Sequence, residues 1–291
     1  MTRRRIAAPP LALLLMACGG SGAGGSTDSG AADGLQDAAP ASFDRGRSAD
    51  ASTEAHVTDV SVADAATPPD ARPSPPAPDA KPRFRFGIDA AQRGKMQSTP
   101  VYHVDDDPVD HPEAPTTCTN FEGGHFPFCY DGHTGSDFLL RGGFPTMDNG
   151  SATVVAAAGG VVEVAEDGNY DRCHASAASV DVVCDGHEMR ANYVQLRHAN
   201  GWVSLYYHLK SGSVLVHVGD RVTCGQPLGL VGSSGRSSMP HLHFQVEDSA
   251  GAVVDPFGGA FSQPESLFTE QKAADGLPGG SCDPAWTLPP E

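Results

Sequence analysis

The sequence has few basic residues and no long apolar segment. Nineteen Lys and Arg stand against 36 Asp and Glu, which gives a formal net charge of −17. That balance argues against a nucleic-acid-binding protein, which needs a basic face, and against electrostatic docking on anionic lipid. No apolar run approaches the ~20 residues of a membrane-spanning helix. Glycine and proline are abundant instead, with 34 Gly and 24 Pro in 291 residues.

The N-terminus has the pattern of an export signal. Arginines at residues 3–5 precede a short apolar run at residues 11–17, and Cys18 follows directly. A basic start, a short apolar run and a small residue before the cut are typical of a secretory signal. The Leu-x-Ala-Cys sequence ending at Cys18 resembles a bacterial lipobox. This resemblance implies that residues 1–17 are removed and that an acylated Cys18 anchors the protein to a membrane, in the outer membrane and periplasm or at the cell surface. Secretion without an anchor is the alternative.

Residues 18–80 predict a disordered linker. Gly and Ser dominate its first part and Ala, Asp and Pro the rest, and Phe43 is its only aromatic residue. Such a segment cannot bury enough apolar surface to offset the entropy lost on folding, and its Pro-rich end favours an extended spacer. A small unrecognised domain is the less favoured alternative. Aromatic residues resume at Phe84, so we expect an N-terminal extension of the folded domain over residues 81–129.

A group of His and Asp side chains lies within that extension. Prolines interrupt it, and the ligands have no fixed spacing. It could bind a cation, but a charged surface loop is the favoured interpretation. Its members are His103, Asp105, Asp106, Asp107, Asp110 and His111.

Seven cysteines occur in the chain, and setting Cys18 aside leaves six. An even number in an exported chain predicts disulfides. No C-x-x-C pair is present, which argues against a structural zinc site of the cysteine type. Six cysteines allow fifteen pairings, and proximity along the chain favours Cys118–Cys129, Cys173–Cys184 and Cys224–Cys282. The last pair would hold a C-terminal tail, residues 256–291, against the domain.

From Ala152 onward the chain has the pattern of many short strands. Gly159-Gly160 and Asp167-Gly168-Asn169 are typical hairpin connections, and no long stretch has helical periodicity. The predicted fold class is therefore all-β, a mainly antiparallel sheet domain over residues 130–255. The expected strands are Val154–Ala158, Val161–Glu166, Val180–Val183, Asn192–His198, Trp202–His208, Val214–Val216, Leu228–Val231 and His241–Glu247.

The last of these strands has two faces of different chemistry. Alternation puts Leu242, Phe244 and Val246 on a buried face. His241 and His243 then share the other face, roughly 6–7 Å apart along the strand, where both can reach one small volume. Taken alone, a pair of exposed strand histidines is the more ordinary explanation.

Two further segments offer ligand-type side chains. His133 and Asp137 lie in a glycine-containing loop that enters a strand, unlike the helical H-E-x-x-H arrangement. His208 ends another expected strand, and alternation there places it on the face of Tyr206. Each segment alone is a weak signal, because surface histidines at strand ends are common.

Together, and in this order, the segments resemble the LytM/lysostaphin-type metallopeptidases of family M23. The resemblance covers about residues 130–250 and rests on His133-x-x-x-Asp137, Tyr207-His208-Leu209, the Gly-rich residues 219–235 and His241-Leu242-His243. It implies a mainly antiparallel β fold with a long groove over the sheet. It also implies one zinc ion held by His133, Asp137 and His243, with His208 and His241 as catalytic histidines that do not bind the metal.

The chemistry of these side chains agrees with that implication. Two histidines and one carboxylate leave a fourth zinc position open for water, which is typical of catalytic sites. Zinc lowers the pKa of bound water to about 7, and a histidine suits proton transfer at neutral pH. His241 is the candidate general base, and His208 the candidate donor to the water or the developing oxyanion. The two roles can be exchanged.

The resemblance, together with the export signal, therefore implies a zinc metalloendopeptidase that hydrolyses the peptide cross-links of bacterial peptidoglycan. The expected partners are peptidoglycan peptides and, through acylated Cys18, a membrane; we expect a monomer. The alternative is a non-catalytic or self-inhibited module that binds the cell wall or activates other wall hydrolases. Residues 84–129 could supply the inhibition, and His125 or Glu247 could fill the fourth zinc position.

Overall fold

The computed structural model describes residues 76–77, 79–98, 102–177 and 181–289. The predicted signal, Cys18 and nearly all of the predicted linker lie outside these residues. No helix in the described part is long and apolar enough to cross a membrane. The last residues of the predicted linker contact the domain, because the Asn200 side-chain amide donates to the carbonyls of Ala77 and Ala80, at 2.9 and 3.1 Å.

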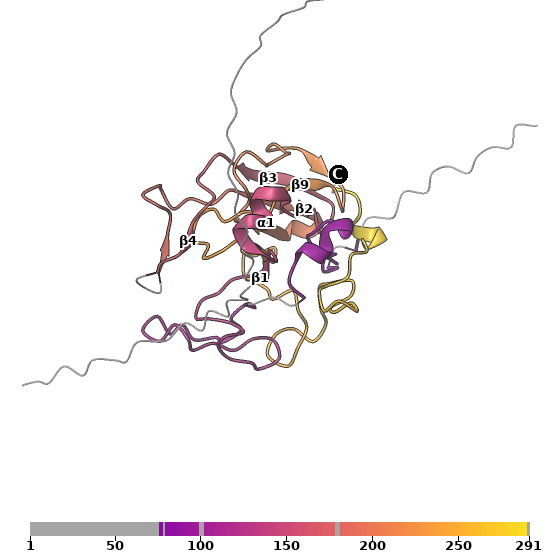
Figure 1. Ribbon diagram of the computed structural model, residues 1–291. Helices are drawn as coiled ribbons and strands as arrows, with labels where there is room; N and C mark the ends of the chain where they lie inside the picture. Colours follow the sequence, from indigo (N-terminus) through magenta and orange to yellow (C-terminus); the bar gives the residue numbers. More distant parts are fainter. Residues whose placement is uncertain (1–75, 78, 99–101, 178–180, 290–291) are drawn as a thin grey trace, which may run out of the picture. The chain divides into compact units, whose positions relative to one another are not determined.

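Strands are the most numerous regular elements of the described residues, beside one α-helix and three short 3-10 helices, and long loops connect them (Figure 1). The elements are η1 (Ala90–Lys95), β1 (Ser136–Leu139), α1 (Gly143–Gly150), β2 (Thr153–Val155), β3 (Gly160–Glu166), β4 (His174–Ala175), β5 (Val182–Val183), β6 (Tyr193–Arg197), η2 (Ala199–Gly201), β7 (Val203–Tyr207), β8 (Arg221–Val222), β9 (Pro227–Leu230), β10 (His241–Glu247) and η3 (Pro284–Trp286).

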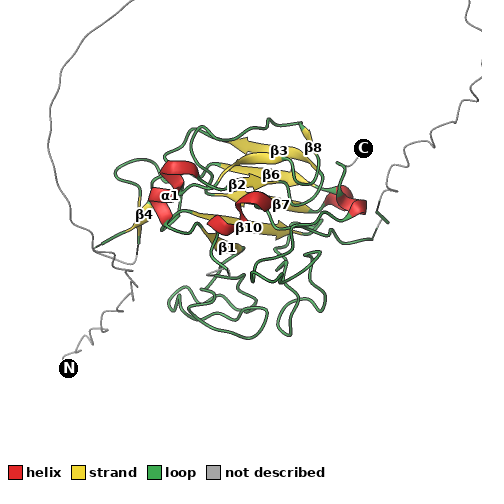
Figure 2. Ribbon diagram, turned by 45° about the vertical axis from the view of Figure 1, so that its right-hand side comes forward, coloured by secondary structure: helices red, strands yellow, loops and turns green. Residues whose placement is uncertain are grey.

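Six of the strands form one sheet in the order β1-β10-β7-β6-β3-β8 (Figure 2). Two smaller sheets pair β2 with β9 and β4 with β5. Every strand pair in the three sheets is antiparallel. The predicted all-β, mainly antiparallel fold class is confirmed.

One local prediction was wrong, and one short helix was not foreseen. The strand expected at 214–216 does not form, because the Val214 N–H donates to the Asp167 carboxylate, at 3.1 Å, and the Leu215 N–H alone donates to β9. The sequence also gave no sign of α1. This helix has eight residues and only Met147 is buried, so it leaves no apolar periodicity to detect.

The apolar core lies against one face of the six-stranded sheet. Leu242, Phe244 and Val246 of β10 are at most 1% exposed, as strand alternation predicts. The upstream extension also contributes fully buried side chains to this core, namely Phe84, Phe86, Ile88 and Met96. The sheet face opposite the core is therefore left for the polar side chains of β1, β7 and β10.

The three disulfides expected from proximity are present: Cys118–Cys129, Cys173–Cys184 and Cys224–Cys282. The third joins the C-terminal tail to the turn before β9. It closes the longest loop, with a sequence separation of 58 residues against 11 for each of the other two.

Removing the third disulfide should destabilise the fold most. Loop-closure entropy assigns about 4 kcal/mol to a loop of this length and about 3 kcal/mol to the short ones. Urea unfolding of Cys224→Ala/Cys282→Ala, compared with Cys118→Ala/Cys129→Ala, measures the difference. A smaller loss for the Cys224–Cys282 pair would contradict the ranking.

Candidate metal centre

The strand register brings Asp137 and His243 together. Asp137 of β1 lies directly opposite His243 of β10, and His133 precedes β1 by three residues. All three side chains are buried, with exposures of 3% for His133, 5% for Asp137 and 8% for His243. A β1–β10 pair thus fixes two candidate ligands, and the short turn before β1 supplies the third.

The donor atoms of these residues have the spacing of a shared metal site. Asp137 Oδ1 lies 3.3 Å from His133 Nε2 and 3.0 Å from His243 Nδ1. The two ring nitrogens are 3.2 Å apart. A tetrahedral zinc ion with bonds of ~2.1 Å keeps its ligand atoms ~3.4 Å apart. Two imidazoles and one carboxylate at these distances therefore fit zinc and leave further coordination positions open.

Outer hydrogen bonds orient both candidate histidine ligands. His133 donates its Nδ1–H to the carbonyl of His103, at 2.7 Å. The other ring nitrogen of His243 lies 3.5 Å from Gln245 Oε1, and Gln245 in turn donates to Glu247, at 2.7 Å. Metal-binding histidines commonly donate their second ring N–H in this way. In each histidine, one ring nitrogen thus points at the other two candidate metal ligands and the other nitrogen points at an oxygen outside them.

Asp137 is held as a carboxylate. Burial would raise its pKa, but the nearby charges and hydrogen bonds of His133 and His241 hold the pKa of Asp137 well below its ordinary value. An anionic oxygen among imidazoles is the charge pattern that suits a divalent cation.

His208 and His241 lie beside this group with matching hydrogen bonds. The His208 Nδ1–H donates to the Ser234 carbonyl and the His241 Nδ1–H to the Met239 carbonyl, each at 2.7 Å. Their ring centroids are 4.6 Å apart. Since a carbonyl only accepts, each neutral ring keeps its Nε2 as a proton acceptor. His241 Nε2 lies 3.4 Å from Asp137 Oδ1.

The two histidines differ in their electrostatic surroundings. Burial and the nearby His241 and His243 lower the pKa of His208 well below its ordinary value. Burial also acts to lower the pKa of His241, but the charge and hydrogen bond of Asp137 outweigh it and the pKa of His241 is raised. Both rings donate to a backbone carbonyl, but their pKa values shift in opposite directions, because the carboxylate of Asp137 outweighs the effect of burial only at His241.

The prediction that His208 lies on the same face as Tyr206 was wrong. The residue does lie beside the site, as expected. Tyr206 lies in the core and accepts a hydrogen bond from the Ala157 N–H, at 2.7 Å. Tyr207 lies opposite His243. His208 has a φ of 64°, a left-handed conformation that non-glycine residues adopt rarely and often at functional sites. This turn ends the alternation of β7 and brings His208 onto the side of Tyr207.

The upstream His and Asp group serves as a turn. Asp105 accepts hydrogen bonds from the N–H groups of Asp107, Thr119 and Gly132, at 3.0–3.1 Å, which is the use that a surface loop makes of a carboxylate. Of the histidines in this group, His103 is buried and supports His133.

Two residues were candidates for the fourth zinc position, His125 and Glu247. Neither joins the three candidate ligands. His125 binds the Cys118 carbonyl, at 2.7 Å, and Glu247 accepts from Gln245. Within the described part of the chain, one group of three or more His, Cys, Asp or Glu side chains could hold a metal ion, and it consists of His133, Asp137 and His243.

Sequence reasoning missed the aromatic residues around the site. Tyr130 stacks on the His133 ring with centroids 4.3 Å apart, and the Tyr102 ring lies 6.3 Å from it. Tyr207 meets His243 edge-on at 5.7 Å. Burial raises the pKa of Tyr130, so it carries a phenol O–H at the rim of the site. The close sequence spacing of Tyr130 and His133 was the available signal; Tyr102 gave none.

Gly135 is required by the close approach of His243. A Cβ at this position would lie 2.4 Å from His243 Nε2. Gly135→Ala should therefore displace the ring and weaken zinc binding at least about tenfold, as for other losses of ligand orientation. Competition with a chromogenic chelator measures the affinity. Gly94→Ala is the matched control, because nothing lies within 4 Å of its added Cβ; equal affinities of the two variants would contradict the prediction.

Comparison with known proteins places the site within a recognised domain. The model of Peptidase family M23 matches residues 132–256. The peptidoglycan DD-endopeptidase ShyA of Vibrio cholerae is 37% identical over 114 residues, which cover 39% of this chain and 20% of ShyA. The murein hydrolase activator EnvC of Escherichia coli is 37% identical over 81 residues, 25% of this chain and 19% of EnvC.

A solved zinc-containing peptidase from Vibrio cholerae aligns with 60% of this chain and 39% of its own, at 23% identity and a TM-score of 0.37. The chain spans about a fifth of the length of the curated relatives that it matches. The matched range includes the three candidate ligands and both neighbouring histidines. The chain therefore contains a domain of peptidase family M23, over residues 132–256.

Proposed function

We propose that the protein is a zinc metalloendopeptidase that hydrolyses the peptide cross-links of bacterial peptidoglycan. The family and the relative named as a peptidoglycan DD-endopeptidase support the reaction and the substrate class. The observation that carries the proposal is the group of three buried donors, His133, Asp137 and His243, with two further histidines beside it.

Each side chain has a stated role in this proposal. His133, Asp137 and His243 would hold the zinc ion, which when bound would supply Lewis-acid polarisation of the scissile carbonyl and lower the pKa of water. His241 accepts the proton of the attacking water on Nε2, because its Nδ1–H is held by Met239. Neutral His208 presents Nε2 as an acceptor, because its Nδ1–H is held by Ser234, and it can donate to the developing oxyanion only after Nε2 has taken a proton from solvent.

The second candidate function is a non-catalytic or self-inhibited module that activates other wall hydrolases. One relative is named a murein hydrolase activator. The upstream segment, residues 84–129, also contacts the candidate ligand His133, through the His103 carbonyl and the ring of Tyr102. Such contacts would let this segment govern access to the site.

Cleavage of cross-linked muropeptide dimers separates the two candidates. The full chain with Cys18→Ala, which blocks acylation, is incubated with dimers and zinc, and the products are resolved by chromatography and mass spectrometry. We expect monomers with zinc and none with a chelator. Intact dimers from several wall types, together with a faster wall amidase in the presence of the protein, would favour the activator.

We also propose that the protein is exported and anchored through acylated Cys18. The arginines, apolar run and lipobox-like sequence support this, and the peptidoglycan substrate lies outside the cytoplasm. Cells fed a labelled fatty acid should label the wild-type protein and not the Cys18→Ala variant. Equal labelling of both would exclude this anchor.

A further inference from the structure

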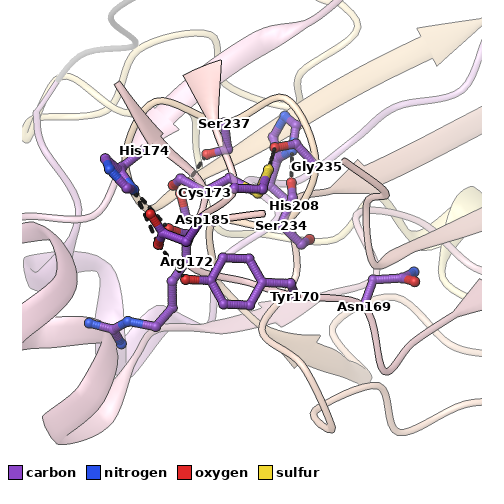
Figure 3. The surroundings of a disulfide bond; sticks show 12 residues. Asn169, Tyr170, Arg172, Cys173, His174, Asp185, His208, Ser234, Gly235 and Ser237 are labelled. Atoms are coloured by element: carbon purple, nitrogen blue, oxygen red, sulfur yellow. Dashed lines mark hydrogen bonds and ion pairs between the residues drawn. A yellow bond between two sulfur atoms is a disulfide. The ribbon is translucent and has the colours of Figure 1, made fainter. Parts of the chain in front are cut away.

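A disulfide-closed hairpin lies against the segment that precedes β10 (Figure 3). The hairpin is formed by β4 and β5 and closed by Cys173–Cys184; we call residues 232–240 the site loop. The Cys173 N–H donates to the Ser233 carbonyl, at 3.0 Å, and the Ser233 hydroxyl donates back to the Cys173 carbonyl, at 2.7 Å. The Ala175 N–H donates to the Ser238 carbonyl, at 2.9 Å. The hairpin therefore holds the site loop at two separate points.

The site loop provides the hydrogen-bond partners of both non-ligand histidines. Its Ser234 carbonyl accepts from His208 Nδ1, and its Met239 carbonyl accepts from His241 Nδ1. The Ser237 hydroxyl lies 3.2 Å from the same nitrogen of His241. These contacts fix the tautomer and direction of both rings, so a shift of the site loop would move both Nε2 atoms.

Two buried hydroxyls join the hairpin to His241. Ser233 Oγ and Ser237 Oγ lie 2.8 Å apart, and both residues are fully buried. Ser237 Oγ also lies 2.9 Å from the Met239 carbonyl. A continuous path of short polar contacts thus runs from Cys173 through Ser233 and Ser237 to the imidazole.

Two contacts confine the middle of the site loop. Gly235 has a φ of 69°, and a Cβ there would lie 2.9 Å from Ala191. Cys184 Sγ lies 3.7 Å from the Gly235 carbonyl oxygen. Figure 3 shows Gly235, Ser237 and the Ser234–His208 pair around the disulfide. The disulfide is therefore part of the surface against which the site loop packs.

We propose that the Cys173–Cys184 hairpin and Ser237 are positioning elements. They hold the site loop so that His208 and His241 face the three candidate metal ligands. The catalytic consequence rests on the proposed function; the geometric one does not. Because misplacing a catalytic group by about 1 Å can cost about 10²-fold in rate, loss of these contacts should reduce turnover without removing the metal.

The first test compares two disulfide variants and one serine variant. Cys173→Ala/Cys184→Ala should lower kcat on muropeptide dimers about 10- to 100-fold, with KM within about twofold and one zinc per chain. Ser237→Ala should lower kcat in the same way by about 3- to 10-fold. Cys224→Ala/Cys282→Ala is the control, because it removes a disulfide that closes a longer loop and lies outside the site loop. This variant should leave kcat unchanged.

The second test observes the histidines directly. In protein with ¹⁵N-labelled histidine, the hydrogen-bonded Nδ1–H signals of His208 and His241 should be visible by NMR in the wild type and in the Cys224→Ala/Cys282→Ala control. They should shift or broaden in Cys173→Ala/Cys184→Ala, and the His241 signal should do so in Ser237→Ala.

The outcomes distinguish this inference from the proposed function. A wild type that binds zinc but cleaves nothing would overturn the proposed function, while the NMR signals would still decide the positioning role. Unchanged signals in folded Cys173→Ala/Cys184→Ala protein, or the same loss in the control, would overturn the inference. If that double variant does not fold, unchanged His241 signals in Ser237→Ala overturn it.

Discussion

Replacing Asp137 by alanine should remove bound zinc and cleavage together. Asp137 Oδ1 is within 3.4 Å of nitrogens from three imidazoles, and the residue is only 5% exposed. Without this anion, the remaining donors are two neutral rings, and the charge that balances a divalent cation is lost. Several kcal/mol of transition-state stabilisation depend on the metal, which corresponds to a loss of about a thousandfold or more in kcat/KM.

The measurement is zinc per chain after dialysis, followed by the muropeptide assay on the same sample. Asp137→Asn preserves the shape of the side chain and removes its charge, so it should also lose zinc. Asp110→Ala is the control, since Asp110 is an exposed member of the upstream His and Asp group. This variant should retain both zinc and activity. Zinc at one per chain in Asp137→Ala would mean that the ligand assignment is wrong.

Strand alternation and motif order were sufficient to predict much of this centre. The period-2 pattern of β10 assigned Leu242 and Phe244 to the core, and the structure confirms both positions. The grouping of Asp137 with His243 was implied by the resemblance to family M23, and the β1–β10 pair that puts them opposite each other was not itself predicted. Alternation along one strand is a local property, which is why the sequence could reveal it.

The parts that the sequence did not reveal depend on single dihedral angles or distant contacts. Nothing in the residues around His208 signals its positive φ, which changes the face on which the ring lies. The contact of Tyr102 with His133 spans 31 positions of the chain and has no periodicity. The same holds for Ser237, whose hydroxyl is ordinary in sequence and is buried between Ser233 and His241 only in the fold.

Variants of His208 and His241 should separate catalysis from metal binding. Neither residue belongs to the group of three donors, so His208→Ala and His241→Ala should each retain one zinc per chain. Each variant should lose about 10²- to 10⁴-fold in kcat, the range of a general acid–base contribution. The zinc measurement is decisive for His241, because its Nε2 lies 3.4 Å from Asp137 Oδ1 and the ring could act as a ligand instead.

The pH profile then assigns the two roles. The variant that lacks the general base should lose the acidic limb of kcat/KM, because the ring that must be deprotonated to accept the proton of the attacking water is missing. The double variant should lose less than the product of the two single losses, since both rings serve one step. His217→Ala, with a side chain 91% exposed, is the control and should change neither zinc nor rate. Loss of zinc in His241→Ala would make His241 a ligand and leave His208 as the only candidate base among the five site residues.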